Sequence, residues 1–377
     1  MARRKADSSV LNLAANRYWP ASTELVGLEF DLLAEGNYDL YPQYTIGLHA
    51  WFLHQIKDLD ADLSAYLHDD QAEKAFNISG LSGQFTSHSR NLQLQAGKTY
   101  QWRICGLSKR VVTGLAKWLR QLPEIVDLKN APLAIQQVRL FHPATTYKKL
   151  ANVEVGRSLS LSFTTPTSFR RKGHHLPLPW PINVFHSYLR RWNEFSGQSI
   201  DQADFLDWVD NNVVIQRHQI QSEKIAAGKR GSVTGFTGAV TYGLSARANE
   251  KPEYGQLFYT LGHYAPYCGT GHKTTFGLGQ TQLGWHPNQT MPELPSVQVL
   301  LAERIDELTQ IFIATKKRTG GNRARESAEA WATVLARREL GDSLQTIAED
   351  LELPYETAKT YSKLARRCLR EMGGESG

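Results

Sequence analysis

A glycine-rich segment near residue 270 holds the residue types best suited to binding a phosphate group. Four glycines lie within residues 269–279, and a His-Lys-Thr-Thr core stands between them. Because glycine has no Cβ atom, its backbone amides can approach an anion closely, while lysine adds charge and threonine adds a hydroxyl donor. The segment therefore predicts an anion-binding loop with the contacts Gly269, Gly271, His272, Lys273 and Thr274. The alternative is that the glycines mark hairpin turns.

The same segment does not fit the patterns of nucleotide-cofactor sites. A phosphate loop of ATP-binding proteins requires G-x-x-x-x-G-K-[ST], but His272 separates the glycine from Lys273 and the first glycine is missing. The dinucleotide pattern G-x-G-x-x-G also fails, because residue 274 is threonine. We therefore predict no cofactor and expect the phosphates to belong to a nucleic-acid backbone.

Three basic clusters favour the same kind of partner. They are Arg170-Arg171-Lys172 with the histidines that follow, residues 316–325, and residues 359–370. A single charged run is usually a solvated surface, and a net charge of +6 over 377 residues is weak support by itself. Combined with the glycine-rich segment, the three clusters indicate nucleic-acid binding.

Histidines are the candidates for catalysis. The sequence has no H-E-x-x-H motif and no paired cysteine–histidine spacing, so we predict no metal site. RNA can be cut without a metal because its own 2′-hydroxyl is the nucleophile, and histidine suits both the removal of that proton and the protonation of the leaving 5′-oxygen. His49 lies early on an expected helix and His68 at the end of a shorter one, so they converge if the chain doubles back. His54 lies on another helical face, and sequence position alone does not choose among them.

Residues 1–145 show the pattern of one α+β domain. Strands are expected at 25–33, 76–81, 99–104 and 133–141, and helices at 41–59, 62–67 and 111–122. The order strand, helix, strand, strand, helix, strand is the ferredoxin-like plan, which RNA-recognition domains share.

Residues 146–286 show the pattern of a second α+β unit. Strands are expected at 158–163, 219–224, 235–244 and 281–285, and helices at 184–195, 201–209 and 254–264. Two similar units in tandem are therefore expected, although the sequence shows no clear internal repeat.

Residues 287–377 differ in character, because a proline-rich linker at 287–295 leads into helices only. Two helices are expected at 297–312 and 326–340, and two more around a short break at Leu353-Pro354. The last pair resembles a helix-turn-helix, with Ala348 at the close-packing position and a basic second helix. A helical hairpin that packs against the core or a partner subunit is the equal alternative.

Composition limits the class of protein. Hydrophobic residues make up 41% of the chain, and no apolar run is long enough to span a membrane. The first residues lack the apolar stretch of a secretory signal, and the three cysteines are far apart. We therefore expect a cytoplasmic protein without disulfides.

Three blocks of the sequence resemble the CRISPR-associated endoribonucleases that cut precursor guide RNA within its repeats, which are members of the RAMP superfamily. The blocks are 48–76, 164–173 and 235–279, and the last is the most specific because it holds the glycine-rich segment. The resemblance implies an α+β fold of two tandem ferredoxin-like domains, here followed by an all-α extension. It also implies metal-free cleavage that leaves a 2′,3′-cyclic phosphate and a 5′-hydroxyl.

The resemblance also implies roles for individual residues. His49 and His68 match the positions of the family's catalytic histidines, with the acid and base roles left open. Residues 170–172 match a basic segment that grips the repeat stem, where guanidinium groups suit phosphate contact. Lys273 or Arg170 is expected to stabilise the pentavalent phosphate.

The expected function is cleavage of CRISPR precursor RNA, after which the protein stays bound to the 3′ hairpin of its product in an effector complex. The first alternative is a non-catalytic subunit that binds the same hairpin. The second is a DNA-binding regulator that acts through residues 287–377. The resemblance does not cover this tail, since typical family members end soon after the glycine-rich segment.

Overall fold

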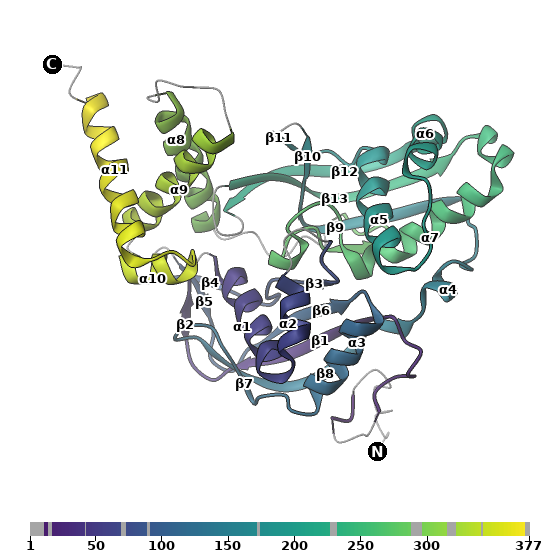
Figure 1. Ribbon diagram of the computed structural model, residues 1–377, viewed down its shortest axis with the longest axis horizontal. Helices are drawn as coiled ribbons and strands as arrows, with labels where there is room; N and C mark the ends of the chain where they lie inside the picture. The colour runs from purple at the N-terminus through teal and green to yellow at the C-terminus, as the bar shows by residue number, and fades with distance from the viewer. Residues whose placement is uncertain are drawn as a thin grey trace.

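The computed structural model describes residues 11–13, 17–41, 43–68, 73–88, 91–171, 174–226, 232–287, 296–314, 322–340 and 342–373. Lys172 and residues 288–295 of the expected linker lie outside this part of the chain. Two α+β domains and a helical tail make up the described chain (Figure 1). The predicted fold class, two tandem ferredoxin-like domains followed by an all-α extension, is confirmed.

The N-terminal domain is built on a five-stranded antiparallel sheet. Its strands are β1 (Leu25–Ala34), β3 (Phe76–Ile78), β6 (Thr99–Gly106), β7 (Ile125–Asp127) and β8 (Pro132–Thr145), in the order β3-β6-β1-β8-β7. One face carries the helices α1 (Tyr44–Leu59), α2 (Ala61–His68) and α3 (Lys109–Leu119). A small second sheet contains β2 (Tyr38–Leu40), β4 (Thr86–His88) and β5 (Asn91–Leu94).

Aromatic side chains fill the core between this sheet and its helices. Phe30 of β1 packs against Trp102 of β6 and Trp118 of α3, with ring centroids 5.3 and 5.5 Å apart. Phe52 of α1 meets the ring of Trp118 edge-on at 5.5 Å. All four side chains are buried, so they hold α1 and α3 on the same face of the sheet.

The C-terminal domain repeats the ferredoxin-like plan. The strands β9 (Ser158–Thr167), β12 (Val213–Ala226), β13 (Ser232–Leu244) and β14 (Thr281–Leu283) form an antiparallel sheet in the order β12-β13-β9-β14. Its helices are α5 (Pro181–Phe195), α6 (Gln202–Asn212) and α7 (Pro252–Cys268). Shorter elements are α4 (Tyr147–Leu150), the hairpin β10 (Phe169–Arg171) and β11 (His174–Leu176), and the 3₁₀ turns η1 (Ala246–Glu250) and η2 (Thr274–Phe276).

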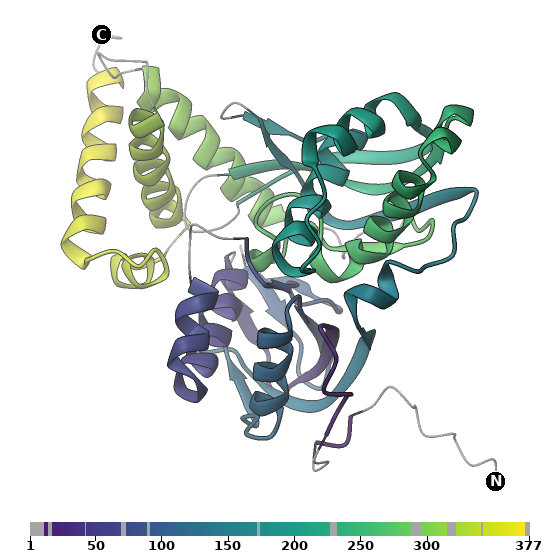
Figure 2. The same ribbon diagram turned by 45° about the vertical axis from the view of Figure 1, so that its right-hand side comes forward.

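The tail consists of α8 (Ser296–Ala314), α9 (Asn322–Glu339), α10 (Leu344–Asp350) and α11 (Tyr355–Gly373). Figure 2 shows these helices as a separate bundle beside the two domains. Apolar side chains including Leu301, Ile305 and Leu335 form its core. None of the described helices is both long and apolar enough to cross a membrane.

The tail contacts both α+β domains. Its helix α8 packs along β12, where Lys224 pairs with Asp306 at 2.6 Å. On the other side Lys129 of the N-terminal domain pairs with Asp350 at the end of α10. Buried Arg337 of α9 donates to the side chain of Gln43 at 3.3 Å. The tail is thus anchored at both domains by charged contacts.

The expected elements differ from the observed ones mainly at their ends. The strand expected at 219–224 runs from Val213 to Ala226, since it pairs with β13 along almost its whole length. The strand expected at 76–81 ends at Ile78. Just beyond that end, Ser79 forms a bridge with Gly277, a residue of the other domain. Pairing of this kind depends on residues far away in the sequence, so local patterns do not reveal it.

Candidate active site

The glycine-rich segment joins the two α+β domains. Gly277 forms a parallel bridge with Ser79, and its N–H donates to the carbonyl of Ile78 at 3.1 Å. The side chain of Gln280 donates from Nε2 to Oδ1 of Asn77 at 2.8 Å and to the carbonyl of Ile78 at 3.1 Å. The segment therefore continues the edge of the N-terminal sheet next to β3.

Close packing of the backbone explains why glycines occupy this segment. At Gly271 φ is +79°, and an added Cβ atom would lie 2.3 Å from the carbonyl oxygen of Ser168. At Gly279 φ is +66°, and an added Cβ atom would lie 2.0 Å from the carbonyl oxygen of Thr270. Contacts this short admit no side chain, so both positions require glycine.

The N–H groups expected to bind phosphate are bonded within the protein. The N–H of Gly269 donates to the carbonyl of Ala265 at 2.8 Å, and that of Gly271 donates to Oγ of Ser187 at 2.8 Å. Thr274 is buried. Direct phosphate contact by Gly269, Gly271 and Thr274 therefore stays a prediction, and the geometry gives these residues a packing role.

A buried arginine that sequence patterns did not reveal holds the segment in place. Arg191 of α5 is 5% exposed, and its guanidinium donates to the carbonyls of Gly269 at 3.3 Å and Gly271 at 2.9 Å. Its Nε lies 3.5 Å from a carboxylate oxygen of Glu73. The spacing of three residues from buried Tyr188 places Arg191 on the apolar face of α5, which is the signal that could have identified it.

His49 lies on α1 against the glycine-rich segment. Its ring stacks on the ring of Phe276, with centroids 4.4 Å apart and planes at 30°. On the same helix Leu48 is fully buried, whereas His49 is half-buried at the edge of the apolar face. Both nitrogens of an imidazole lie in the ring plane, so stacking fixes the ring while its edge can meet a ligand. The segment thus orients His49.

His68 lies in a different environment. It is the last residue of α2 and is exposed, and α2 packs against α1. Residues 69–72 lie outside the described chain, but Glu73 beyond them pairs with Arg190 of α5 at 3.2 Å. Glu73, five residues after His68, thus contacts the C-terminal domain before the chain enters β3. A shared catalytic role for His49 and His68 stays a prediction.

The β10–β11 hairpin places basic and histidine side chains beside the glycine-rich segment. Arg170 is exposed and pairs in register with His175. Arg171 is the next residue of β10. The ring of His175 stacks on that of His272, with centroids 5.3 Å apart and planes at 15°. This stacked pair connects the hairpin to the glycine-rich segment.

The two stacked histidines are neutral at pH 7. Burial, together with the nearby charges of Lys273 and Arg170, lowers the pKa of His175 and of His272 to about 4. Nδ1 of His272 donates to the carbonyl of Ser168 at 2.8 Å. Its buried Nε2 is left as an acceptor without a partner among the described residues. In this conformation Nε2 of His272 is therefore closed to solvent, and RNA contact by His272 stays a prediction.

Lys273 supplies the charge of the segment. Its backbone is left-handed, with φ of +59°, and the residue is half-buried. Burial and then the neighbouring guanidinium of Arg170 lower the pKa of Lys273 to about 8, and Glu329 of α9 opposes that shift. With this pKa, Lys273 is charged in most protein molecules at pH 7, and a bound phosphate would favour the charged form further.

An open cavity lies between the hairpin and α5. Its volume is about 240 Å³, and Arg170, Arg190 and His272 are among the residues that line it. Arg190 is the residue that pairs with Glu73, beyond the end of α2. The cavity therefore lies where the segments carrying the predicted RNA contacts approach the chain that follows His68.

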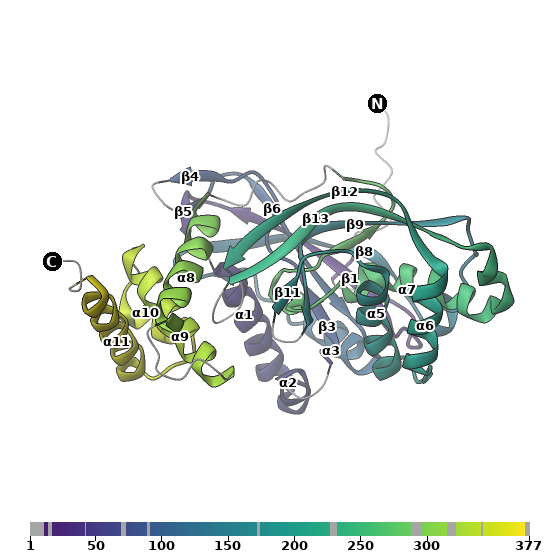
Figure 3. The same ribbon diagram turned by 90° about the horizontal axis from the view of Figure 1, so that it is seen from above.

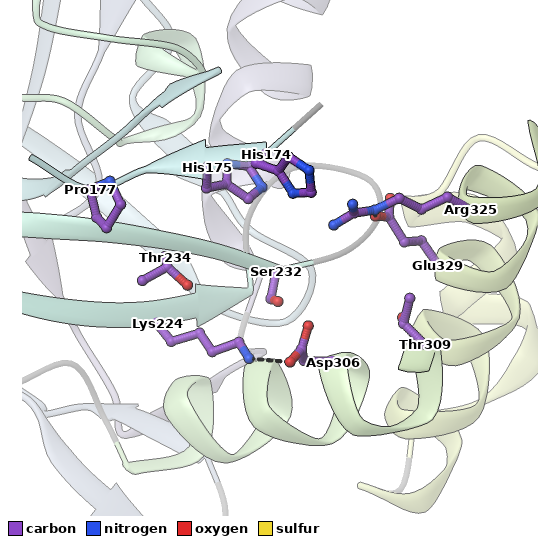
Figure 4. Close-up of a pocket in the computed structure, with 10 residues that line it drawn as sticks. All are labelled: His174, His175, Pro177, Lys224, Ser232, Thr234, Asp306, Thr309, Arg325 and Glu329. Atoms are coloured by element: carbon purple, nitrogen blue, oxygen red, sulfur yellow. Dashed lines mark hydrogen bonds and ion pairs between the residues drawn. The ribbon is translucent and has the colours of Figure 1, made fainter. Parts of the chain in front are cut away.

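A second cavity, of about 310 Å³, separates the hairpin from the tail (Figure 4). His174 and His175 line one side, and Arg325 of α9 lies across from them. Lys224 lines the floor and pairs with Asp306. Lys224 and Arg325 carry the positive charge of this cavity, and each pairs with an acidic residue that also lines it, Asp306 and Glu329.

Family comparisons assign most of the chain to one kind of protein. A family model described as the CRISPR Cas6 N-terminal domain matches residues 30–150. A second, described as CRISPR-associated endoribonuclease Cas6, matches residues 161–281. A CRISPR-associated endoribonuclease Cas6 from Streptococcus thermophilus is 23% identical over 242 residues, which cover 63% of this chain and 90% of that protein.

Solved structures show the same relationship. A Cas6 product complex aligns with a TM-score of 0.55 at 25% identity and covers 69% of this chain and 99% of its own. Thermus thermophilus Cas6 has the same fold, with a TM-score of 0.55 at 22% identity over 70% of this chain and 100% of its own. The two family models end before the helical tail.

Proposed function

The chain belongs to the Cas6 family of CRISPR-associated endoribonucleases, and we propose that it cuts CRISPR precursor RNA within the repeats without a metal ion. One observation carries the proposal. His49 is a half-buried imidazole that stacks on Phe276 where the two RNA-recognition-like domains meet. The same glycine-rich segment contacts the β10–β11 hairpin through His272. A histidine positioned like His49 can move protons at an RNA backbone.

The proposed reaction is an internal transfer of the phosphoryl group. One histidine removes the proton of the 2′-hydroxyl, whose oxygen attacks the adjacent phosphorus in line. The bond to the 5′-oxygen breaks, and a second proton donor protonates that oxygen. The products are a 2′,3′-cyclic phosphate and a 5′-hydroxyl. We assign these two proton transfers to His49 and His68, with either histidine as the base.

Basic residues of the C-terminal domain hold the RNA in this proposal. Arg170, Arg171 and Lys172 are proposed to contact the repeat stem. The guanidinium groups of the two arginines suit bidentate hydrogen bonds to phosphate, and the ammonium group of the lysine adds charge. Lys273 lies three residues before Phe276 in the sequence, and we propose that it stabilises the charge that develops on the phosphorane. His272, the residue before Lys273 in the sequence, is the other proposed RNA contact at this position.

The protein is proposed to keep its product. Structures of a related Cas6 at 25% identity are described as a product complex and as a substrate mimic complex. When several basic residues bind the phosphate backbone of the RNA, the product dissociates slowly, because many phosphate contacts must break together. The retained hairpin is then the point at which subunits of an effector complex join.

Cleavage of the cognate repeat RNA in the presence of EDTA tests the chemistry. The proposal expects unchanged rates in EDTA and a cyclic phosphate on the upstream product, identified by mass spectrometry. A single 2′-deoxyribose at the scissile position should abolish cutting, because the nucleophile is missing. Loss of activity in EDTA, or cutting of the deoxy-substituted RNA, would refute the internal-nucleophile mechanism.

A further inference from the structure

The last two helices of the tail form a helix-turn-helix. Ser343 caps α10 by accepting from the N–H of Thr346 at 3.0 Å, and α10 ends at Asp350. In the turn Glu352 adopts a left-handed φ of +51°, which redirects the chain into α11. Ala348 is only 2% exposed. Because this position is small, the second helix can cross the first closely.

A third helix completes the unit. Val334 of α9 packs with Ile347 and Leu351 of the α10 region, and Leu353 and Tyr361 pack against this cluster. The arrangement of α9, α10 and α11 is therefore that of a compact three-helix domain with its own small core. Modules of this kind use the helix after the turn to read DNA.

The two faces of α11 are chemically different. Ala358, Ser362 and Ala365 are buried and face the bundle. The residues Lys359, Lys363, Arg366, Arg367 and Arg370 are exposed. Lys359, Lys363, Arg366 and Arg370 recur every three to four residues, which places them along one side of the helix with Arg367 beside them. No acidic residue lies between the first and the last of the five. This basic stripe is about 17 Å long at the rise of an α-helix.

The tail is docked so that this stripe stays accessible. The contacts with the two domains are made by α8, α9 and α10, through Asp306, Arg337 and Asp350. Figures 1 and 3 both show α11 at the outer edge of the molecule, with the other tail helices between it and the two domains. The alternative expectation is a helical hairpin that packs against the core or a partner subunit. Its first helix, α10, does contact the N-terminal domain through Asp350, whereas the basic residues of α11 are exposed.

We propose that α11 is a recognition helix that binds the major groove of duplex DNA, at a site separate from the RNA site. At its N-terminal end Tyr355, Glu356 and Thr360 are exposed polar groups that can meet base edges. Further along, Lys363 and Arg366 are placed to contact phosphates. The major groove of A-form RNA is too deep and narrow for a helix, so duplex DNA is the ligand that fits.

The test compares full-length variants binding to a mixed-sequence duplex DNA. The double variant Lys363→Ala/Arg366→Ala removes two charges from the stripe. The matched control Lys148→Ala/Lys149→Ala removes two exposed charges from α4, at the opposite end of the molecule in Figure 1. Affinity is measured by fluorescence anisotropy at several salt concentrations. Cleavage of repeat RNA by both variants at the wild-type rate shows that they are folded.

The proposal expects the stripe variant to lose more affinity for duplex DNA than for a duplex RNA of the same length, because duplex RNA is also held at the separate RNA site. The dependence of log affinity on log salt concentration should become shallower by about 2 in the stripe variant and stay unchanged in the control. Equal DNA affinity of the stripe variant and the wild type would overturn the proposal. So would a stripe-dependent preference for duplex RNA, or a change in oligomeric state instead of DNA affinity, which would make the stripe a protein interface.

Discussion

At the scale of single residues, the structure ties the candidate chemistry to contacts between domains. The ring of His49 belongs to the N-terminal domain, and the ring it stacks on, that of Phe276, belongs to the glycine-rich segment of the C-terminal domain. Arg191 fixes the other end of that segment from α5. The position of the imidazole therefore depends on how the two domains meet and not on α1 alone.

The proposed phosphate contact of Lys273 predicts that RNA binding depends on pH above neutrality. The pKa of Lys273 lies at about 8, so its charge is present at pH 7 and is largely lost at pH 9. We expect the RNA affinity of the wild type to fall between pH 7 and pH 9, because the positive charge of Lys273 is lost in this interval. The variant Lys273→Arg keeps its charge at pH 9 and should show a flatter profile, as measured by filter binding. An identical pH dependence in both proteins would exclude Lys273 as a phosphate contact.

The same residue influences stability in the opposite direction. Because burial lowers the pKa of Lys273 from 10.5 to about 8, the unfolded chain binds more protons than the folded protein between these values. Stability from this group therefore rises with pH over that window. Reduced RNA binding at pH 9 consequently does not require unfolding.

Only some residues of the candidate site could be predicted from the sequence. His49 and the basic cluster at Arg170 were predicted, because a histidine near a helical apolar face and a run of charges are visible locally. The roles of Phe276 and Arg191 were not, because each depends on a partner from a distant segment. The residue type alone does not show whether an arginine is buried or exposed, and only its position on the helix gives an indication.

At the scale of elements, the glycine-rich segment is a joint between sheets as well as a candidate RNA contact. Its density of glycines predicted close backbone approach, and the close approach observed is to other backbone of the protein. The sequence alone could not show whether a bound anion or a carbonyl of the protein lies against these glycines, because either can come this close only where no Cβ atom is present.

Substitution of Gly271 tests this packing role. In Gly271→Ala the new methyl group would meet the carbonyl of Ser168 in addition to a left-handed φ of +79°. The control Gly197→Ala has a similar φ of +72° with nothing within 4 Å. The left-handed backbone alone costs about 1–2 kcal/mol, so the control should lose that amount of unfolding free energy and Gly271→Ala clearly more. Equal losses in urea unfolding would show that the close contact is unimportant.

At the scale of the whole molecule, the tail is integrated by one buried charge network. Arg337 is 1% exposed and pairs with Asp342 at 2.6 Å and Asp350 at 2.8 Å. Asp350 also pairs with Lys129 of the N-terminal domain. The helical nature of the tail was predictable from its periodicity, whereas this docking was not, because it joins residues more than two hundred positions apart.

Removing Arg337 should therefore disturb the tail far more than removing a surface arginine. Arg337→Ala removes the arginine partner of half-buried Asp342 and leaves buried Asp350 with Lys129 alone. Loss of one member of a buried ion pair costs about 3–5 kcal/mol. Arg304 of α8 pairs with Glu339 and Glu307 at the surface, so Arg304→Ala should cost below about 1 kcal/mol. Denaturant unfolding compares the two. Similar small losses would mean that the Arg337 network contributes little.

The most direct test of the account is single-turnover cleavage of cognate repeat RNA by His49→Ala. A general acid or base contributes about 10²–10⁴-fold, so the rate should fall by that factor while RNA affinity stays at the wild-type value. The control His54→Ala alters an exposed histidine of the same helix that pairs with Asp58, and it should cleave normally. A His49→Ala protein that cleaves at the wild-type rate would contradict the assignment of catalysis to the domain junction.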